Sequence, residues 1–140
     1  MKGLIFMSNK NKKEIDWIVH YVCGGDDKLH FKPHLANIHT HGMRELYNHP
    51  EFQIVLTVEY KYALYILNKL GCMVQSGRRF KPGEKVSGIG ICDLPLYEAT
   101  DNGKPVLRVI IPDKQFLLPD DERCGFPYNL QYLSTEDLME

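Results

Sequence analysis

The sequence lacks an excess of charge of either sign. Its 17 basic and 18 acidic residues give a formal net charge of −1, so no overall field would draw the protein toward nucleic acid or an anionic membrane. A basic stripe with interleaved aromatic residues, which nucleic-acid-binding surfaces use, is also missing. We therefore expect no nucleic-acid partner.

Long apolar runs are absent as well. No stretch approaches the roughly 18 apolar residues that would cross a bilayer. The apolar part of the N-terminal segment, Leu4 to Met7, is shorter than the roughly 7–15 residues of a signal-peptide core. Met7 is an alternative start to Met1. We therefore expect a cytoplasmic protein with no membrane partner.

Paired-cysteine motifs and the motifs of common enzymes are missing. The four cysteines are widely spaced and form no C-x-x-C pair, so the usual zinc and redox motifs are excluded and free thiols are expected in a reducing cytosol. There is no G-x-S-x-G nucleophile elbow and no Gly-Lys-Ser/Thr phosphate loop. The sequence therefore assigns no reaction, whether the protein is an enzyme stays open, and no cofactor is predicted.

What is present indicates an ordinary globular domain. The 140 residues are 44% apolar and 25% charged, which suits a single domain. No internal repeat or low-complexity linker divides the chain. We predict a flexible N-terminal lead over residues 1–14, one domain over residues 15–128, and a C-terminal tail over residues 129–140.

Apolar residues alternate with a period of two in several stretches, which predicts a sheet. Residues 15–23 also fit a helical stripe, but their β-branched and aromatic side chains favour a strand. Further strands are predicted over residues 35–41, 51–58, 89–94, 96–100 and 106–111. An Asp-Asn-Gly turn at residues 101–103 joins the last two strands as a hairpin.

One helix is predicted over residues 59–70, where large apolar side chains recur at spacings of three and four. Gly71 is expected to end it, and residues 71–75 to re-enter the sheet. Residues 43–50 are expected to form a loop. The predicted fold class is α+β, with an antiparallel or mixed, curled sheet of five to six strands and one main helix.

Chemistry is concentrated in residues 30–51, HFKPHLANIHTHGMRELYNHPE, which hold five of the six histidines. His30 and His34 lie on either side of Pro33, ahead of the strand that follows, so we treat these two as bystanders. Alternation places His39 and His41 on the same strand face.

Pairing of strand 35–41 with strand 51–58 would bring further polar groups to that face. Their apolar residues must share one side of the sheet, so Glu51 and Gln53 are expected beside His39 and His41. The loop residue His49 would lie near the same end.

Three interpretations of this cluster follow. The first is a small-molecule-binding or acid/base pocket, with His49 and Glu51 as the candidate catalytic residues because a carboxylate can orient a histidine. Its predicted ligand-binding residues are His39, His41, Gly42, His49, Glu51 and Gln53.

The second interpretation is a non-catalytic interaction module, such as a homodimerisation domain, whose polar sheet face is an interface. The third is a divalent-metal site on His39, His41 and His49. Two histidines at H-x-H spacing on a strand lie about 6–7 Å apart at Cα, close enough to share an ion. We nevertheless predict no metal.

Several short motifs follow one another in a fixed order. They are an aromatic and apolar strand at Trp17–Cys23, Thr40-His41-Gly42, Asn48-His49-Pro50-Glu51, Gly77-x-x-Phe80-x-Pro82-Gly83-Glu84-x-Val86, and Ile110–Asp113. Over roughly residues 15–128, this order resembles a widespread bacterial family of small proteins known only as a domain of unknown function. Two features depart from the family pattern: the doubled histidines at His39 and His41, and the displaced Phe126-Pro127-Tyr128 segment. The family has no established activity, so the resemblance implies none.

Overall fold

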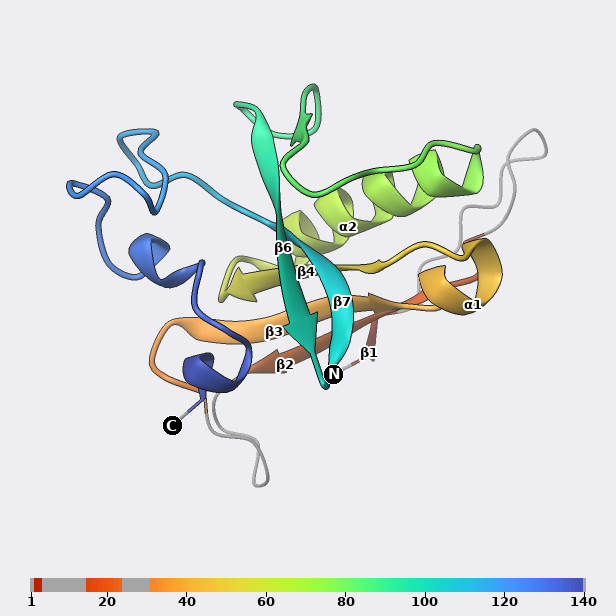
Figure 1. Ribbon diagram of the computed structural model, residues 1–140, viewed down its shortest axis with the longest axis horizontal. Helices are drawn as coiled ribbons and strands as arrows, with labels where there is room; N and C mark the ends of the chain where they lie inside the picture. Colours follow the sequence, from red (N-terminus) through yellow and green to blue (C-terminus); the bar gives the residue numbers. More distant parts are fainter. Residues whose placement is uncertain (1, 4–14, 24–30, 140) are drawn as a thin grey trace.

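The computed structural model describes residues 2–3, 15–23 and 31–139 (Figure 1). In chain order, the elements are β1 (Lys2–Gly3), β2 (Ile18–Cys23), β3 (Leu35–His41), α1 (Met43–Tyr47), β4 (Glu51–Leu56), α2 (Tyr60–Gln75), β5 (Lys85–Val86), β6 (Leu94–Asp101), β7 (Lys104–Val109), and the 3-10 helices η1 (Tyr128–Leu130) and η2 (Glu136–Leu138). The predicted N-terminal lead is described only at β1, and His30 lies outside the described residues.

The described strands form one mixed sheet in the order β1-β2-β3-β4-β7-β6-β5. β4 and β7 are parallel, and every other neighbouring pair is antiparallel. The predicted α+β class, with a mixed sheet and one main helix, is confirmed. The sheet has seven strands rather than five or six because a two-residue strand occupies each edge.

The prediction of strands was correct for most of the sheet. Residues 15–23 contain strand β2 rather than a helix, and β3 has the predicted bounds. The predicted strand over residues 89–94 is wrong: the chain bends there, after Gly88 takes a φ of 81° that strands do not use, and β6 begins only at Leu94. β4 also ends earlier than predicted, at Leu56.

The predicted hairpin between the last two long strands is confirmed. β6 and β7 pair up to Asp101 and Lys104, and the turn residues Asn102 and Gly103 have φ angles of 53° and 78°. Positive φ at both central residues is the geometry of a tight type I′ turn. Asp101 and Lys104 therefore face each other at the tip of this hairpin.

Helix α2 covers one face of the sheet, packing against β2, β3 and β4 (Figure 1). Its buried stripe contains Ala63, Leu64, Ile66, Leu67, Leu70 and Val74. Ile38 and Ile54, which are paired across β3 and β4, belong to the same buried core. The alternate residues of these strands point to the opposite face, which carries the polar groups discussed below.

The predicted end of this helix is wrong. Gly71 does not terminate it; α2 continues through Gly71 to Gln75. A Cβ atom at Gly71 would lie 2.5 Å from Cζ2 of Trp17, a side chain that is 1% exposed. The glycine is therefore needed for the close approach of the Trp17 ring to the helix, and not for a change of backbone direction.

Replacing Gly71 with alanine should lower the free energy of unfolding by about 1–3 kcal/mol through overpacking. Alanine would otherwise favour a helix by about 1 kcal/mol, so the sign of the change is informative. Urea unfolding measures it. In the double variant Trp17→Phe/Gly71→Ala, the smaller ring should reduce the cost of the alanine. A Gly71→Ala protein as stable as the wild type would contradict this account.

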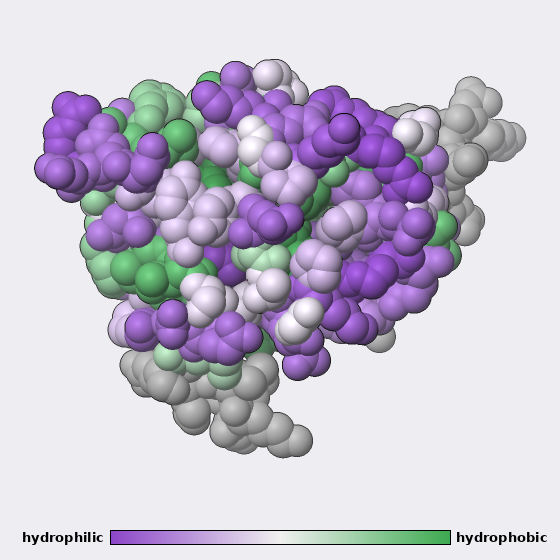
Figure 2. Space-filling model, in the orientation of Figure 1, coloured by the Kyte–Doolittle hydropathy of each residue, from purple (hydrophilic) through white to green (hydrophobic). Residues whose placement is uncertain are grey.

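The C-terminal segment closes part of the face that α2 leaves open. Arg108 on β7, which is fully buried, donates from Nη1 to the carbonyl oxygens of Gln131, at 2.8 Å, and Leu133. Its Nη2 donates to Thr135 Oγ1 at 3.2 Å. Residues 129–139, which the sequence placed in a tail outside the domain, are thus fixed to the sheet. Figure 2 shows the largely hydrophilic surface on this side, with a hydrophobic group beside the C-terminal segment.

Candidate functional site

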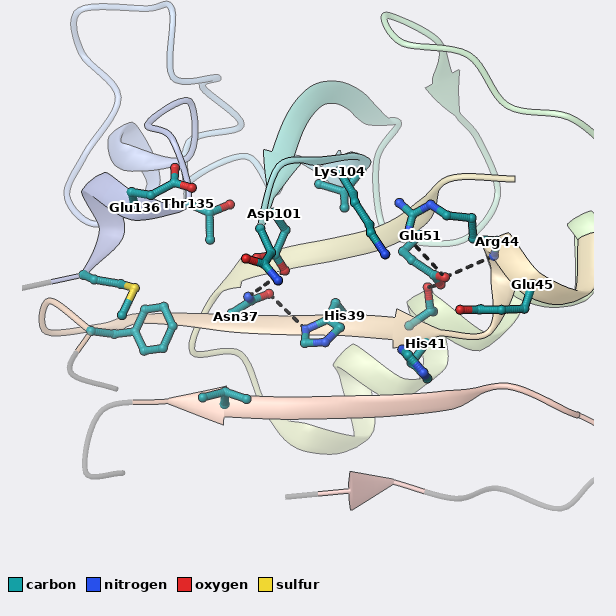
Figure 3. A pocket seen from close by; sticks show the side chains of 16 residues that line it. Asn37, His39, His41, Arg44, Glu45, Glu51, Asp101, Lys104, Thr135 and Glu136 are labelled. Carbon is teal, nitrogen blue, oxygen red and sulfur yellow. Dashed lines mark hydrogen bonds and ion pairs between the residues drawn. The ribbon is translucent and has the colours of Figure 1, made fainter. Parts of the chain in front are cut away.

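A cavity of about 600 Å³ lies over β3, on the face that α2 does not cover (Figure 3). Its walls are built by β3, by α1, by the tip of the β6–β7 hairpin and by the C-terminal segment around η2. This volume is in the range of sites that bind small molecules. The walls combine imidazole, carboxylate, amide and ammonium groups, so the cavity suits a polar ligand.

The structure brings together some of the predicted site residues and separates others. His39, His41 and Glu51 line the cavity, whereas Gly42, His49 and Gln53 do not. Gln53 nevertheless lies directly opposite His39 in the pairing of β3 and β4, as strand alternation predicted. It is fully buried beneath the cavity floor.

A chain of hydrogen bonds connects the buried core to His39. Arg108, which carries only donors, donates from Nε to Gln53 Oε1 at 2.8 Å. This orients the Gln53 amide, and its Nε2 donates to Asn37 Oδ1 at 3.0 Å. Asn37 Nδ2 donates to Asp101 Oδ2 at 3.0 Å, so Asn37 Oδ1 acts as an acceptor. The His39 Nδ1 atom, 3.1 Å from that oxygen, therefore carries a proton.

The protonation of His39 determines what its ring offers to the cavity. Burial lowers the pKa of His39, although the nearby Asp101 carboxylate opposes the shift. The imidazole is therefore neutral at pH 7, with its proton on Nδ1 and a lone pair on Nε2. No hydrogen bond to Nε2 is present within the described residues. His39 can accept a hydrogen bond or a proton from a molecule in the cavity.

Two further imidazoles surround His39. The rings of His20 and His39 meet edge to face, with centroids 5.2 Å apart, and those of His20 and His41 stack at 5.5 Å. His20 on β2 was not predicted as part of the site. The alternation of residues 15–23 puts His20 on the face opposite Trp17. The pairing of His20 with His39 across β2 and β3 then brings it to the site.

Glu51 holds the chain turn at the end of β3. Its carboxylate accepts hydrogen bonds from Thr40 Oγ1 at 2.8 Å and from the backbone N–H groups of Gly42, Met43 and Arg44 at 3.3, 3.1 and 3.1 Å. These N–H groups lie at the start of α1, where a helix has no internal acceptors. The predicted loop over residues 43–50 is therefore wrong in its first half: the buried carboxylate stabilises a short helix.

His49 lies away from the cavity and packs among aromatic side chains. Its ring contacts Phe52 and Phe80, with centroids 5.2 and 6.1 Å away. Nδ1 is 2.8 Å from the carbonyl oxygen of Pro50, and Nε2 accepts the N–H of Phe80 at 3.1 Å. Both ring nitrogens are occupied and the residue is 2% exposed. His49 thus anchors the segment that follows α2.

Stability should depend on pH through His49 and His39. Burial lowers the pKa of both in the folded protein, whereas the unfolded chain has values of about 6.5. Below that pH the unfolded state binds more protons, so stability rises with pH through this window and is lost as the pH falls. The free energy of unfolding in urea should therefore be lower at pH 5.5 than at pH 7.5.

A histidine variant identifies the source of this dependence. His49→Gln should lose less stability between pH 7.5 and pH 5.5 than the wild type, because it removes one of the groups that must be neutral. His41→Gln, a change of an exposed side chain, is the matched control. An identical pH dependence in His49→Gln and wild type would show that His49 does not contribute.

Five charged residues that line the cavity were not predicted from the sequence: Arg44, Glu45, Asp101, Lys104 and Glu136. Asp101 and Lys104 line the cavity from the tip of the β6–β7 hairpin. The turn itself was predicted. The parallel pairing of β7 with β4 was not. Only this long-range pairing brings the hairpin tip over β3, and no local sequence signal reveals it.

The three predicted metal ligands are not brought together. His39 and His41 line the cavity, while His49 points into the aromatic cluster. Within residues 2–3, 15–23 and 31–139, no group of three His, Cys, Asp or Glu side chains is placed to hold a metal ion.

Comparisons with known proteins leave the site to be interpreted on its own geometry. No family model, no curated protein and no solved structure matches this chain. In the described part of the chain, no helix is both long and apolar enough to cross a membrane.

Proposed function

We propose that the protein binds a small polar molecule in the cavity over β3, with His39 as the principal contact. The observation that carries the proposal is the state of His39: Asn37 occupies Nδ1, and Nε2 has no partner within the described residues. An unpaired acceptor in a cavity wall of about 600 Å³ favours a ligand that donates a hydrogen bond.

The same arrangement supports acid/base chemistry as the mode of action. A histidine that is neutral near pH 7 can take a proton from a bound molecule, and its backing by Asn37 and Asp101 resembles the oriented histidines of general-base sites. In this proposal His39 replaces His49 as the candidate base. Glu51 and His49 support the surrounding backbone, because their polar atoms are already hydrogen-bonded.

Two broader inferences, on family and on cellular location, accompany the proposed function. We infer from the order of sequence motifs that the chain belongs to the bacterial family that it resembles. We also infer a cytoplasmic location, as the sequence led us to expect.

A thermal-shift screen against a library of polar metabolites tests the proposal. A ligand at about 100 times its Kd stabilises the folded state by about 2.7 kcal/mol, which raises Tm by several degrees. The shift should disappear in His39→Phe and persist in His34→Phe, whose substitution lies outside the cavity. A library in which no compound raises Tm would overturn the proposal. A molar mass in light scattering that falls on His39→Phe substitution would instead support the homodimerisation module.

A further inference from the structure

Two cations line the cavity, Arg44 and Lys104. Arg44 donates to the carbonyl oxygen of Pro105 at 2.7 Å and lies 4.0 Å from Glu51, which leaves Lys104 as the cation to consider for a ligand. Lys104 begins β7, and its side chain extends into the space between His39 and Glu51 (Figure 3). No ion pair or hydrogen bond to its ammonium group is present within the described residues. The nearby Glu51 carboxylate already accepts from Thr40 and three backbone N–H groups. The ammonium donors of Lys104 are thus free to bind an anionic group.

Two acceptors accompany this cation. His39 offers the lone pair of Nε2, and Asp101 offers its second carboxylate oxygen, since only Oδ2 is bonded to Asn37. Both residues line the cavity beside Lys104 (Figure 3). Acceptors of this kind match a hydroxyl or an ammonium group on the ligand.

The charge of the walls limits the anion. Four carboxylates line the cavity, those of Glu45, Glu51, Asp101 and Glu136, against the two cations Arg44 and Lys104. Like charges repel at short range. A phosphate with two negative charges would be repelled by these carboxylates more strongly than a singly charged group. A singly charged carboxylate would still be attracted by Lys104 and would be repelled less by the carboxylates of the wall.

From these groups we infer that the ligand is a compact carboxylate carrying a hydroxyl or ammonium group on the adjacent carbon. The carboxylate binds Lys104, and the neighbouring donor binds His39 and Asp101. This assignment rests on the proposed small-molecule site and specifies its chemistry.

Four small probes test the ligand class: L-lactate, L-alanine, propionate and ethanolamine. Each is titrated to tens of millimolar into ¹⁵N-labelled protein while the imidazole signals of His39 are followed by NMR. Lactate or alanine should shift these signals saturably, and whichever binds more tightly distinguishes the hydroxyl from the ammonium. Propionate lacks the donor and ethanolamine lacks the carboxylate, so each should bind about tenfold more weakly or worse.

Lys104→Met is the decisive variant. It should weaken the better probe by about tenfold or more, whereas Lys114→Met, a change of an exposed residue outside the cavity, should leave the affinity unchanged. Because the Lys104 side chain is exposed and makes no hydrogen bond or ion pair within the described residues, the variant should fold, which circular dichroism verifies.

Three results would overturn the ligand class: ethanolamine binding as tightly as lactate and alanine, Lys104→Met binding like the wild type, or none of the probes moving the His39 signals. The proposed function fails separately, when no library compound raises Tm in a His39-dependent way. A library ligand without a carboxylate would therefore contradict this inference and leave the site itself in place.

Discussion

Replacing Glu51 with alanine should lower the free energy of unfolding by about 3–5 kcal/mol, because it removes a buried charge that is fully hydrogen-bonded. Four donors lose their acceptor together: the Thr40 hydroxyl and the N–H groups of Gly42, Met43 and Arg44. All three N–H groups lie at the start of α1, so this helix should loosen. Urea unfolding gives the energy, and hydrogen exchange at Met43 and Arg44 locates the effect.

A second acidic residue serves as the control for this change. Glu98→Ala replaces an exposed glutamate on β6, and should change stability by no more than about 0.5 kcal/mol. If Glu51→Ala were as stable as Glu98→Ala, the carboxylate would not support the turn after β3. It would then be available for the chemical role that the sequence first suggested.

Arg108→Met should cost about 2–4 kcal/mol and should also change the state of His39. The substitution leaves Gln53 Oε1 and the carbonyl groups of Gln131 and Leu133 without their donor, and each buried unsatisfied group costs about 1–3 kcal/mol. Removing the desolvated guanidinium offsets part of this cost. Burial lowers the pKa of Arg108 to about 10, so the charge is present at neutral pH.

The effect on His39 separates an orienting role from a purely structural one. Without the Arg108 donor, the Gln53 amide can reverse and present its oxygen to Asn37. This opposes the bond from Asn37 to Asp101, so in part of the molecules Asn37 should turn its Nδ2 toward His39. We expect a mixture of Nδ1–H and Nε2–H tautomers in ¹⁵N NMR spectra of the variant. Arg123→Met is the control, since Arg123 pairs with Asp121 at the surface and such pairs contribute about 0–1 kcal/mol. An unchanged tautomer in Arg108→Met would contradict the orienting role.

Strand alternation was the most reliable guide to this fold. It predicted β3 to the residue and placed His39 and Gln53 on one face of neighbouring strands. The Asn102-Gly103 turn was predictable for the same reason: each signal depends on residues that are close in sequence. These local signals were sufficient to locate the floor of the cavity.

The roles of individual polar residues were harder to predict. The sequence emphasised His49 and Glu51, yet their partners are mostly backbone N–H groups, at Phe80 and at the start of α1. Backbone groups look alike in every sequence, so a histidine or glutamate that binds them cannot be distinguished from one that faces a ligand. The hydrogen bonds of the folded protein instead single out His39, whose Nδ1 is bonded to Asn37 and whose Nε2 has no partner within the described residues.

Contacts between distant segments account for most of the remaining errors. Gly71 signals the end of a helix unless the Trp17 ring is known to lie against it. Residues 129–139 have no periodic pattern, and their attachment depends on Arg108, near the end of β7. Neither partner is identifiable without the three-dimensional fold.

The central claim is that His39 presents an unprotonated Nε2 to the cavity at neutral pH. Long-range ¹H–¹⁵N NMR of the imidazole rings tests it directly, because the two nitrogens have distinct shifts in each protonation state. The account predicts that His39 at pH 7 has a protonated Nδ1 and a bare Nε2. A ring that is protonated on Nε2, or on both nitrogens, would contradict it.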